Sequence, residues 1–339
     1  MKYIAPIWLP GGNLQTIWAA TQSAKSLKSA ANPYRRERWE TPDGDFIDVD
    51  FANPKETTSL SLENLKPIKR PLLLLFHGLE GSSGSHYALA FERVARQRGW
   101  AYAVPHFRGC SGELNRAPRA YHSGDFEEIG WMLNQFKVAQ DKANGGPIIA
   151  VGISLGGNAL MRWAQEAGSQ AAQTVKAVAS VSSPLDLAAS GVAIGKGFNR
   201  LVYTRMFLKT MKPLALQRLA LHPGLFDAEK LKASHDLYEF DNVFTAPVHG
   251  FKNTEDYWLR ASAKPHMHRI QLPALALNAL NDPFVPAASL PKQSEVGQNV
   301  TLWHPAQGGH VGFPAGAFPG HVMDMPEAVS DWLAGHLPA

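Results

Sequence analysis

The stretch "VGISLGGNAL" (151–160) contains Ser154 with a glycine two places to either side, Gly152 and Gly156. A serine in this setting is either a nucleophile held on a sharp turn or a small residue that a tight turn selects. A serine hydroxyl is a weak nucleophile at neutral pH. The nucleophile interpretation therefore requires a base, an acid and donors for an oxyanion elsewhere in the chain.

The segments on either side of Ser154 favour the nucleophile. The apolar run "GPIIAVGIS" predicts a buried strand, and "GGNALMRWAQEAG" has the apolar spacing of a helix. At such a strand–turn–helix connection, Gly152, Gly156 and Gly157 remove side chains that would clash. The backbone amide of Leu155 then lies at a helix N-terminus, where it can donate to an oxyanion.

The base is predicted to be His310, one of 13 histidines. It follows the last predicted strand in the loop "QGGHVGF", where Gly308 and Gly309 allow the imidazole to fold back over the sheet edge. Three other histidines are better explained as surface or packing residues: His235, His268 and His304.

Two aspartates compete for the acid that orients the base. Asp282 follows a predicted strand in "LNALNDPFVP" and gives the chain order Ser…Asp…His. Its alternative role is capping of the turn before a proline. Asp186 lies one strand earlier, in "SSPLDL", directly before a helical segment. We prefer Asp282, whose carboxylate would fix the imidazole tautomer.

A second oxyanion donor is expected after the predicted strand "LLLLF". The following residues, His77 and Gly78, lead to Leu79, whose backbone N–H is the candidate. His77 is expected to lock this loop by packing. The amides of Leu79 and Leu155 would then converge on one oxygen.

Other reactive residue types give weaker signals. Cys110 lies beside Arg108 in "PHFRGCSGE", but no histidine partner is evident, so we expect a structural loop rather than a reactive thiol. His266 and His268 in "HMH" lack further ligands, so no metal site is predicted.

The surrounding pattern predicts the scaffold. Residues 35–52 contain two alternating runs joined by "TPDGD", which is typical of a hairpin, and a polar segment follows over 53–70. From Pro71 onward, short apolar runs alternate with helical ones. This alternation predicts an α/β protein with a mostly parallel sheet and helices on both faces.

Residues 187–264 interrupt the alternation with helical patterns and no clear strand. An insertion of this kind lies above the carboxyl edge of such sheets. We therefore expect a helical cap at 187–264 and a core made of 1–186 and 265–339. The first 32 residues, rich in Pro and Gly, are expected to form an irregular arm.

Bulk properties exclude several classes of function. The chain has 339 residues, of which 45% are hydrophobic and 18% charged, as in ordinary globular proteins. The net charge of +4 comes without a dense basic run, so no nucleic-acid partner is expected. One cysteine permits no internal disulfide. Without a signal-peptide pattern or a long apolar run, we expect a cytoplasmic protein with peripheral membrane contact at most. The oligomeric state is unknown.

Taken together, "GNLQTIW", "HGLEGSSGS", "HFRGCSGE", "GISLGGNAL", "NDPFVP" and "GGHVGF" resemble the YheT-like branch of the α/β hydrolases. That branch is related to animal ABHD-type esterases and lipases and to yeast medium-chain ester synthase/esterases. The resemblance implies Ser154 as nucleophile, Asp282 as acid, His310 as base and hydrolysis of carboxylic esters. It is weakest over 187–264, so a lipid specificity is not carried over.

The sequence thus predicts a cofactor-free serine esterase for a small-molecule ester, with a short- to medium-chain acyl group suggested by the apolar cap. Two alternatives remain open. An acyltransferase would pass the acyl group to an alcohol instead of water. A non-catalytic protein could bind a small molecule on the same scaffold. Epoxide hydrolases and dehalogenases are disfavoured, because they need a carboxylate in place of Ser154.

Overall fold

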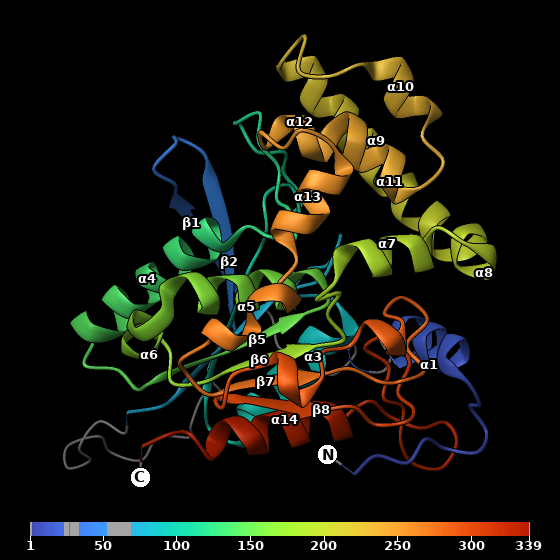
Figure 1. Cartoon of the computed structure of the whole chain (residues 1–339). Coiled ribbons are helices and arrows are strands. Elements are labelled where there is room, and N and C mark those ends of the chain that lie inside the picture. The colour runs from blue at the N-terminus through green and yellow to red at the C-terminus, as the bar shows by residue number, and fades with distance from the viewer. Residues whose placement is uncertain (1, 24–26, 28–33, 53–68, 339) are drawn as a thin grey trace.

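The computed structural model describes residues 2–23, 27, 34–52 and 69–338. One eight-stranded sheet runs through the molecule in the order β1-β2-β4-β3-β5-β6-β7-β8 (Figure 1). Strands β3 to β8 pair in parallel, whereas β2 pairs antiparallel with both β1 and β4. The strands are β1 (Tyr34–Glu40), β2 (Phe46–Ala52), β3 (Leu72–Phe76), β4 (Ala101–Pro105), β5 (Ile148–Ile153), β6 (Val178–Val181), β7 (Ala274–Leu277) and β8 (Val300–Trp303).

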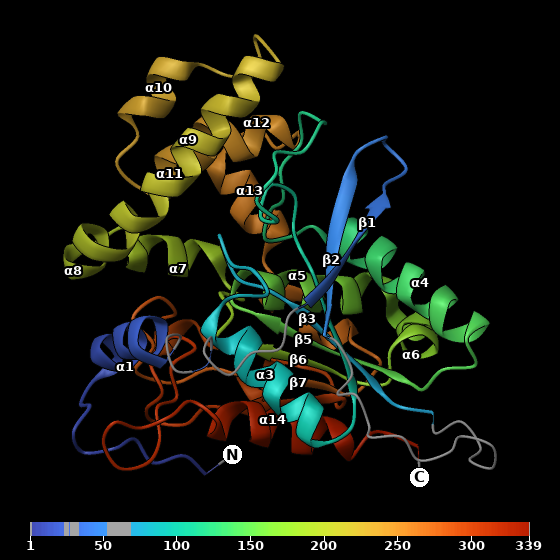
Figure 2. The same cartoon turned by 180° about the vertical axis from the view of Figure 1, so that it is seen from behind.

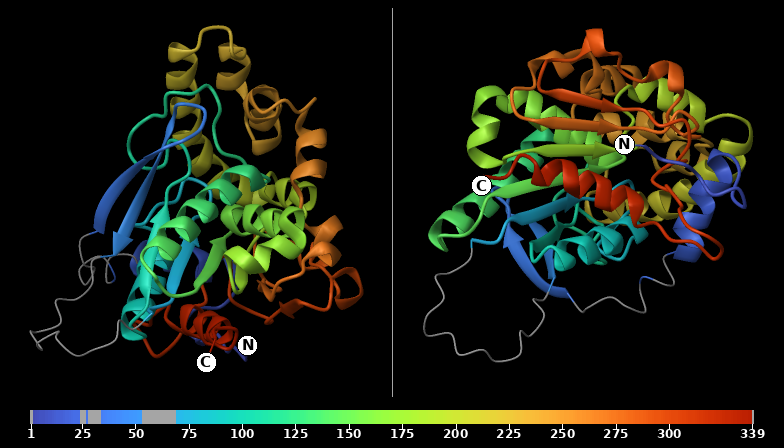
Figure 3. Two further views of the ribbon diagram at one scale, coloured as in Figure 1. Left: turned by 90° about the vertical axis from the view of Figure 1, so that its left-hand side faces the viewer. Right: turned by 90° about the horizontal axis from the view of Figure 1, so that it is seen from below.

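Helices cover both faces of the sheet, which confirms the predicted fold class. On one face lie α3 (His86–Gln97) and α14 (Asp324–Ala334), seen below the sheet in Figure 2 and in front of it in the right-hand view of Figure 3. On the other face lie α4 (Phe126–Lys142), α5 (Leu155–Ala167) and α6 (Ala171–Thr174).

The two faces of the sheet carry separate apolar cores. In β3, Leu73 and Leu75 pack with α3 and α14, while Leu72, Leu74 and Phe76 pack with α4 and α5. Every side chain of β3, β5, β6 and β7 is buried. A strand covered on both faces needs apolar residues at every position, which explains the unbroken runs in the sequence.

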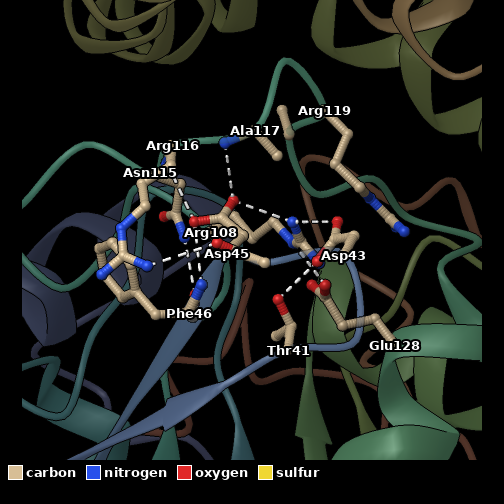
Figure 4. Close-up of polar contacts among 12 residues, drawn as sticks. Thr41, Asp43, Asp45, Phe46, Arg108, Asn115, Arg116, Ala117, Arg119 and Glu128 are labelled. Carbon is tan, nitrogen blue, oxygen red and sulfur yellow. Dashed lines mark hydrogen bonds and ion pairs between the residues drawn. The ribbon is translucent and has the colours of Figure 1, made fainter.

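The predicted hairpin is confirmed, and a buried ion cluster attaches its turn to the core (Figure 4). Arg108 donates from Nη1 to Asp43 at 2.8 Å and Asp45 at 2.9 Å, and from Nε to Glu128 at 2.6 Å. Asp45 and Glu128 are buried, so removal of Arg108 would leave carboxylates uncompensated. Arg108 therefore has a structural role in the "HFRGCSGE" loop.

Residues 182–262 form no strand and instead build helices at the carboxyl edge of the sheet (Figures 1 and 2). The 3-10 helix η5 (Lys264–Arg269) then packs against α5 before β7 begins. Several of the helices in 182–262 share a small apolar core of their own, which includes Leu208, Leu231 and Phe240. The division into core and cap stays a prediction. The helices are α7 (Leu187–Ile194), α8 (Gly197–Asn199), η3 (Arg200–Thr204), α9 (Arg205–Leu221), α10 (Ala228–Ala233), α11 (Leu237–Phe240), η4 (Asp241–Thr245), α12 (Ala246–Val248) and α13 (Thr254–Ala261).

Of the arm predicted over the first 32 residues, 2–11 form no helix or strand, as expected, but the prediction is wrong for 12–23. Helix α1 (Gly12–Trp18) continues into a π-helical turn, η1 (Ala19–Ser23). Gln15 and Thr16 of α1 are buried although both are polar, because they bond to a distant loop. Residues 24–26 and 28–33 of this arm, and 53–68 of the polar segment, lie outside the described residues.

Candidate active site

Ser154 occupies the turn between β5 and α5 in a rarely adopted backbone conformation. Its φ is 51° and its ψ is −118°, and its side chain does not cap the helix that it precedes. Such a conformation costs about 1–3 kcal/mol and persists only where the surroundings impose it. The Ser154 amide donates to the carbonyl of Val181 at 2.8 Å, which fixes the turn against β6. The hydroxyl is left to other partners.

The glycines around Ser154 are required by close approach of the backbone. A Cβ on Gly152 would lie 2.5 Å from both the carbonyl oxygen of Gly156 and the Cα of Gly157. A Cβ on Gly156 would lie 2.4 Å from the carbonyl oxygen of His77, and one on Gly157 would meet neighbouring serine hydroxyls. Only glycine lets β5, α5 and the loop after β3 approach this closely.

The structure brings Ser154, His310 and Asp282 into one hydrogen-bonded chain. His310 Nε2 lies 3.0 Å from Ser154 Oγ, and His310 Nδ1 lies 2.9 Å from Asp282 Oδ2. A carboxylate only accepts, so Nδ1 carries the hydrogen and Nε2 remains free to accept from the serine hydroxyl. Asp282 also accepts from the amides of Phe284 at 2.8 Å and Val285 at 3.2 Å. Its side chain is 0% exposed, and that of His310 is 10% exposed.

Helix α1 holds the loop that carries His310, which sequence reasoning did not foresee. The His310 amide donates to Thr16 Oγ1 at 2.8 Å. Gln15 Oε1 accepts from the Gly308 amide and from Asn281 Nδ2, both at 3.0 Å. In the sequence, the motif "GNLQTIW" supported only the family resemblance. Two polar residues on a short helix do not indicate which loop they bind.

The loop after β3 places Leu79 at the same cavity as Leu155. The amides on either side of Leu79 are already bonded: Gly78 donates to Tyr87 Oη at 3.0 Å and Glu80 to Tyr121 Oη at 2.9 Å. Over the part of the chain that the structure describes, the Leu79 and Leu155 amides have no such acceptor. Both residues line one cavity with Ser154 and His310. Two free amides beside a serine hydroxyl can stabilise a negative oxygen.

His77 locks this loop as a neutral side chain. Its ring is fully buried; Nδ1 donates to the carbonyl of Gly78 at 2.8 Å and Nε2 accepts from the Phe107 amide at 3.0 Å. Burial, aided by the neighbouring His106, lowers the pKa of His77 to about 3. The uncharged ring therefore ties the loop after β3 to the loop after β4 across the neutral pH range.

The cavity at Ser154 is lined mostly by apolar side chains. Phe284 packs on the His310 ring, with ring centroids 4.2 Å apart, and forms one wall. Helices α7, α9, α11 and α13 supply much of the remaining wall. The apolar lining residues include Leu187, Ile194, Phe207, Met211, Leu237, Trp258 and Val285. Such a lining suits a hydrocarbon group attached to a carbonyl held at Ser154.

The other residues considered for a catalytic or metal-binding role have different surroundings. Asp186 caps α7 by accepting from the Ala189 amide at 3.0 Å. Burial raises the pKa of the Cys110 thiol, so it is not an activated thiolate. Within the described ranges, no group of three or more His, Cys, Asp or Glu side chains is arranged to hold a metal ion.

Comparison with known proteins shows the family of this chain. Residues 71–317 match the family described as alpha/beta hydrolase fold. The chain belongs to this family. This α/β hydrolase is also 38% identical over 306 residues to the "Putative esterase YheT" of Escherichia coli, which covers 89% of this chain and 85% of the relative.

A relative with lower sequence identity and a solved structure are also similar to this chain. The human phospholipase ABHD3 is 26% identical over 319 residues, which covers 94% of this α/β hydrolase and 75% of the relative. The esterase Pf2001 of Pyrococcus furiosus superposes with a TM-score of 0.55 at 15% identity, over 94% of this chain and 95% of that one. The last likeness shows the fold alone. No helix in the described part of the chain is both long and apolar enough to cross a membrane.

Proposed function

We propose that this α/β hydrolase cleaves carboxylic esters through Ser154, His310 and Asp282. Ser154 Oγ attacks the ester carbonyl while His310 Nε2 takes the hydroxyl proton. His310 then gives this proton to the leaving alkoxide, and an alcohol departs. Water attacks the acyl-serine in the same way and releases the carboxylic acid.

The amides of Leu79 and Leu155 act on the tetrahedral intermediate. Its oxygen becomes negative only when Ser154 has attacked, and preorganised donors stabilise that charge without reorientation. Asp282 holds the His310 tautomer and stabilises the imidazolium that forms during attack. The observation that carries the proposal is the hydrogen-bonded chain from Ser154 Oγ through His310 to Asp282, at 3.0 and 2.9 Å.

We further propose that the acyl group is short to medium in length and that residues 187–264 act as a cap over it. The apolar walls contributed by α7, α9 and α13 support both points. The names of the relatives, an esterase and a phospholipase, agree with an ester substrate. A panel of p-nitrophenyl esters of increasing acyl length tests the preference directly.

The deciding experiment compares Ser154→Ala with Ser330→Ala. The first removes the nucleophile, so we expect loss of fluorophosphonate labelling and a fall in kcat on p-nitrophenyl butyrate of about 10⁴-fold or more. Ser330 is also buried but lies in α14, on the opposite face of the sheet, so its replacement should leave both signals unchanged. Labelling and turnover that persist in a folded Ser154→Ala protein would refute the proposal.

A further inference from the structure

A second cavity, of about 70 Å³, adjoins the one at Ser154. The two share five lining residues: Leu79, Leu155, Met211, Asp241 and Tyr257. Leu79 and Leu155, whose amides are proposed to hold the oxyanion, therefore line both spaces. A substrate whose carbonyl lies at Ser154 can extend one arm into each cavity.

Arg218, on α9, is a buried cation that lines this second cavity. It is 3% exposed. Its Nη1 donates to the backbone carbonyl of Arg119, and no carboxylate in the described ranges lies within ion-pair distance of the guanidinium. Burial lowers the pKa of Arg218, but a guanidinium stays charged in proteins. The side chain thus keeps a charge and several donors without an anionic partner.

Three other charged groups line this cavity: one arginine that is ion-paired and two carboxylates that are hydrogen-bonded. Arg108 is bound to three carboxylates (Figure 4). Glu80 accepts from the Tyr121 hydroxyl at 2.9 Å. Asp241 accepts from Trp258 Nε1 at 2.9 Å, and burial raises its pKa to about 6. Of the two arginines that line this cavity, Arg218 is the one with no carboxylate within ion-pair distance in the described structure.

The loop after β4 lies against Arg218. Gly109 has a φ of +83°, and a Cβ added there would lie 3.6 Å from Arg218 Nη2. A buried cation without a partner is destabilising unless something compensates it. In a cavity that shares lining residues with the one at Ser154, that compensation can come from the substrate.

We propose that Arg218 binds an anionic group, a carboxylate or a phosphate, carried by one arm of the ester that Ser154 attacks. A guanidinium can donate two parallel hydrogen bonds to either group. This inference rests on the proposed function and names its substrate class: an ester with an apolar group on one side of the carbonyl and an anion on the other.

Matched pairs of esters, one neutral and one anionic, test the inference separately for the acyl side and the alcohol side of the substrate. On the acyl side, 4-nitrophenyl butyrate is compared with mono-4-nitrophenyl succinate. On the alcohol side, butyryl glycerol is compared with butyryl glycerol 3-phosphate. We expect wild-type protein to prefer the anionic member of one pair. In Arg218→Met, kcat/KM for that ester should fall by about 10- to 100-fold, the range for hydrogen bonds between charged groups. The neutral member should change less than about twofold.

Two further variants distinguish an anion-binding role of Arg218 from a purely structural one. Arg218→Lys keeps the charge but loses the fork of donors, so it should retain part of the preference. Arg200→Met removes an exposed cation from η3, directly before α9, and should not change kcat/KM for either ester of the pair. An equal loss on neutral and anionic esters would mean that Arg218 only holds the loop at Arg119, and it would overturn the inference. So would the absence of a wild-type preference in both pairs.

If Arg218→Met does not fold, inorganic phosphate provides the readout. It should inhibit hydrolysis of 4-nitrophenyl butyrate competitively in wild-type protein and more weakly in Arg218→Lys. Equal inhibition of the two would overturn the inference. Failure of the proposed function has a different signature, because hydrolysis of the neutral ester would then not depend on Ser154.

Discussion

Asp282 shows how much one side chain does at this site. Its two oxygens accept from the His310 ring and from the amides of Phe284 and Val285, with no exposure to solvent. In Asp282→Asn, an amide NH₂ would face one of these donors. If it faces the ring, the tautomer that accepts from Ser154 is lost. We therefore expect kcat on p-nitrophenyl butyrate to fall by about 10³- to 10⁴-fold, with KM nearly unchanged.

Asp186→Asn is the matched control, because sequence reasoning weighed this aspartate for the same role. Asp186 caps α7 and does not contact His310. Asparagine caps helices about as well as aspartate, so stability and activity should both stay close to wild type. Equal losses in the two variants would contradict the distinct role of Asp282.

At the scale of elements, α1 is the structural support of the His310 loop. Gln15 bonds Gly308, two positions before His310, and Asn281, directly before Asp282. Gln15→Leu keeps the volume but removes these bonds, so the imidazole loses its fixed position. Because a misplaced base costs turnover more than substrate binding, we expect kcat to fall by about 10- to 100-fold with little change in KM.

Leu14→Ser, on the same helix, controls for damage to α1 itself. Leu14 is half-exposed, so this change should leave turnover intact. A structural loss alone would lower the melting temperature of Gln15→Leu without a selective fall in kcat. Gln15→Glu adds a further readout, since its new carboxylate beside the loop should alter the pH profile of kcat. Wild-type kcat and pH profile in both Gln15 variants would refute the positioning role.

These elements also show where prediction from sequence succeeds and where it stops. The strands were predictable because burial on both faces demands unbroken apolar runs, as in "LLLLF" of β3. The meeting of Ser154, Asp282 and His310 was predictable because parallel strands end at one edge of the sheet. Helix α1 was not, since its polar side chains are held by partners about 266 to 294 positions away in the chain. Arg218 carried no sequence signal either.

For the molecule as a whole, buried titratable groups make stability depend on pH in opposing directions. Burial lowers the pKa of His77 and His122 to about 3 and of His86 to about 4. These rings are neutral when folded but take up a proton below pH ~6.5 when unfolded, so they destabilise the fold as pH falls. Burial raises the pKa of Glu128 to about 7 and of Asp241 to about 6. Such acids have the opposite effect, because the folded state binds the proton more tightly.

A single variant isolates the contribution of His77 to the pH dependence of stability. In His77→Gln, the side-chain oxygen can still accept from the Phe107 amide, but no group titrates. At pH 7.5 the variant should be less stable than wild type by about 1–3 kcal/mol. As pH falls from 7.5 to 5, wild type alone loses about 1.4 kcal/mol per unit below pH ~6.5 on account of His77. The difference in the free energy of unfolding should therefore shift by about 2 kcal/mol in favour of the variant.

Urea unfolding at pH 7.5, 6 and 5 measures this shift, and the acids cancel because they are present in both proteins. His235→Gln is the control, since His235 is exposed and its replacement removes a histidine without removing a buried ring. A constant difference between wild type and His77→Gln would mean that the folded protein accommodates a charged His77. The loop that presents Leu79 would then not depend on a neutral ring, and the account given for His77 would be wrong.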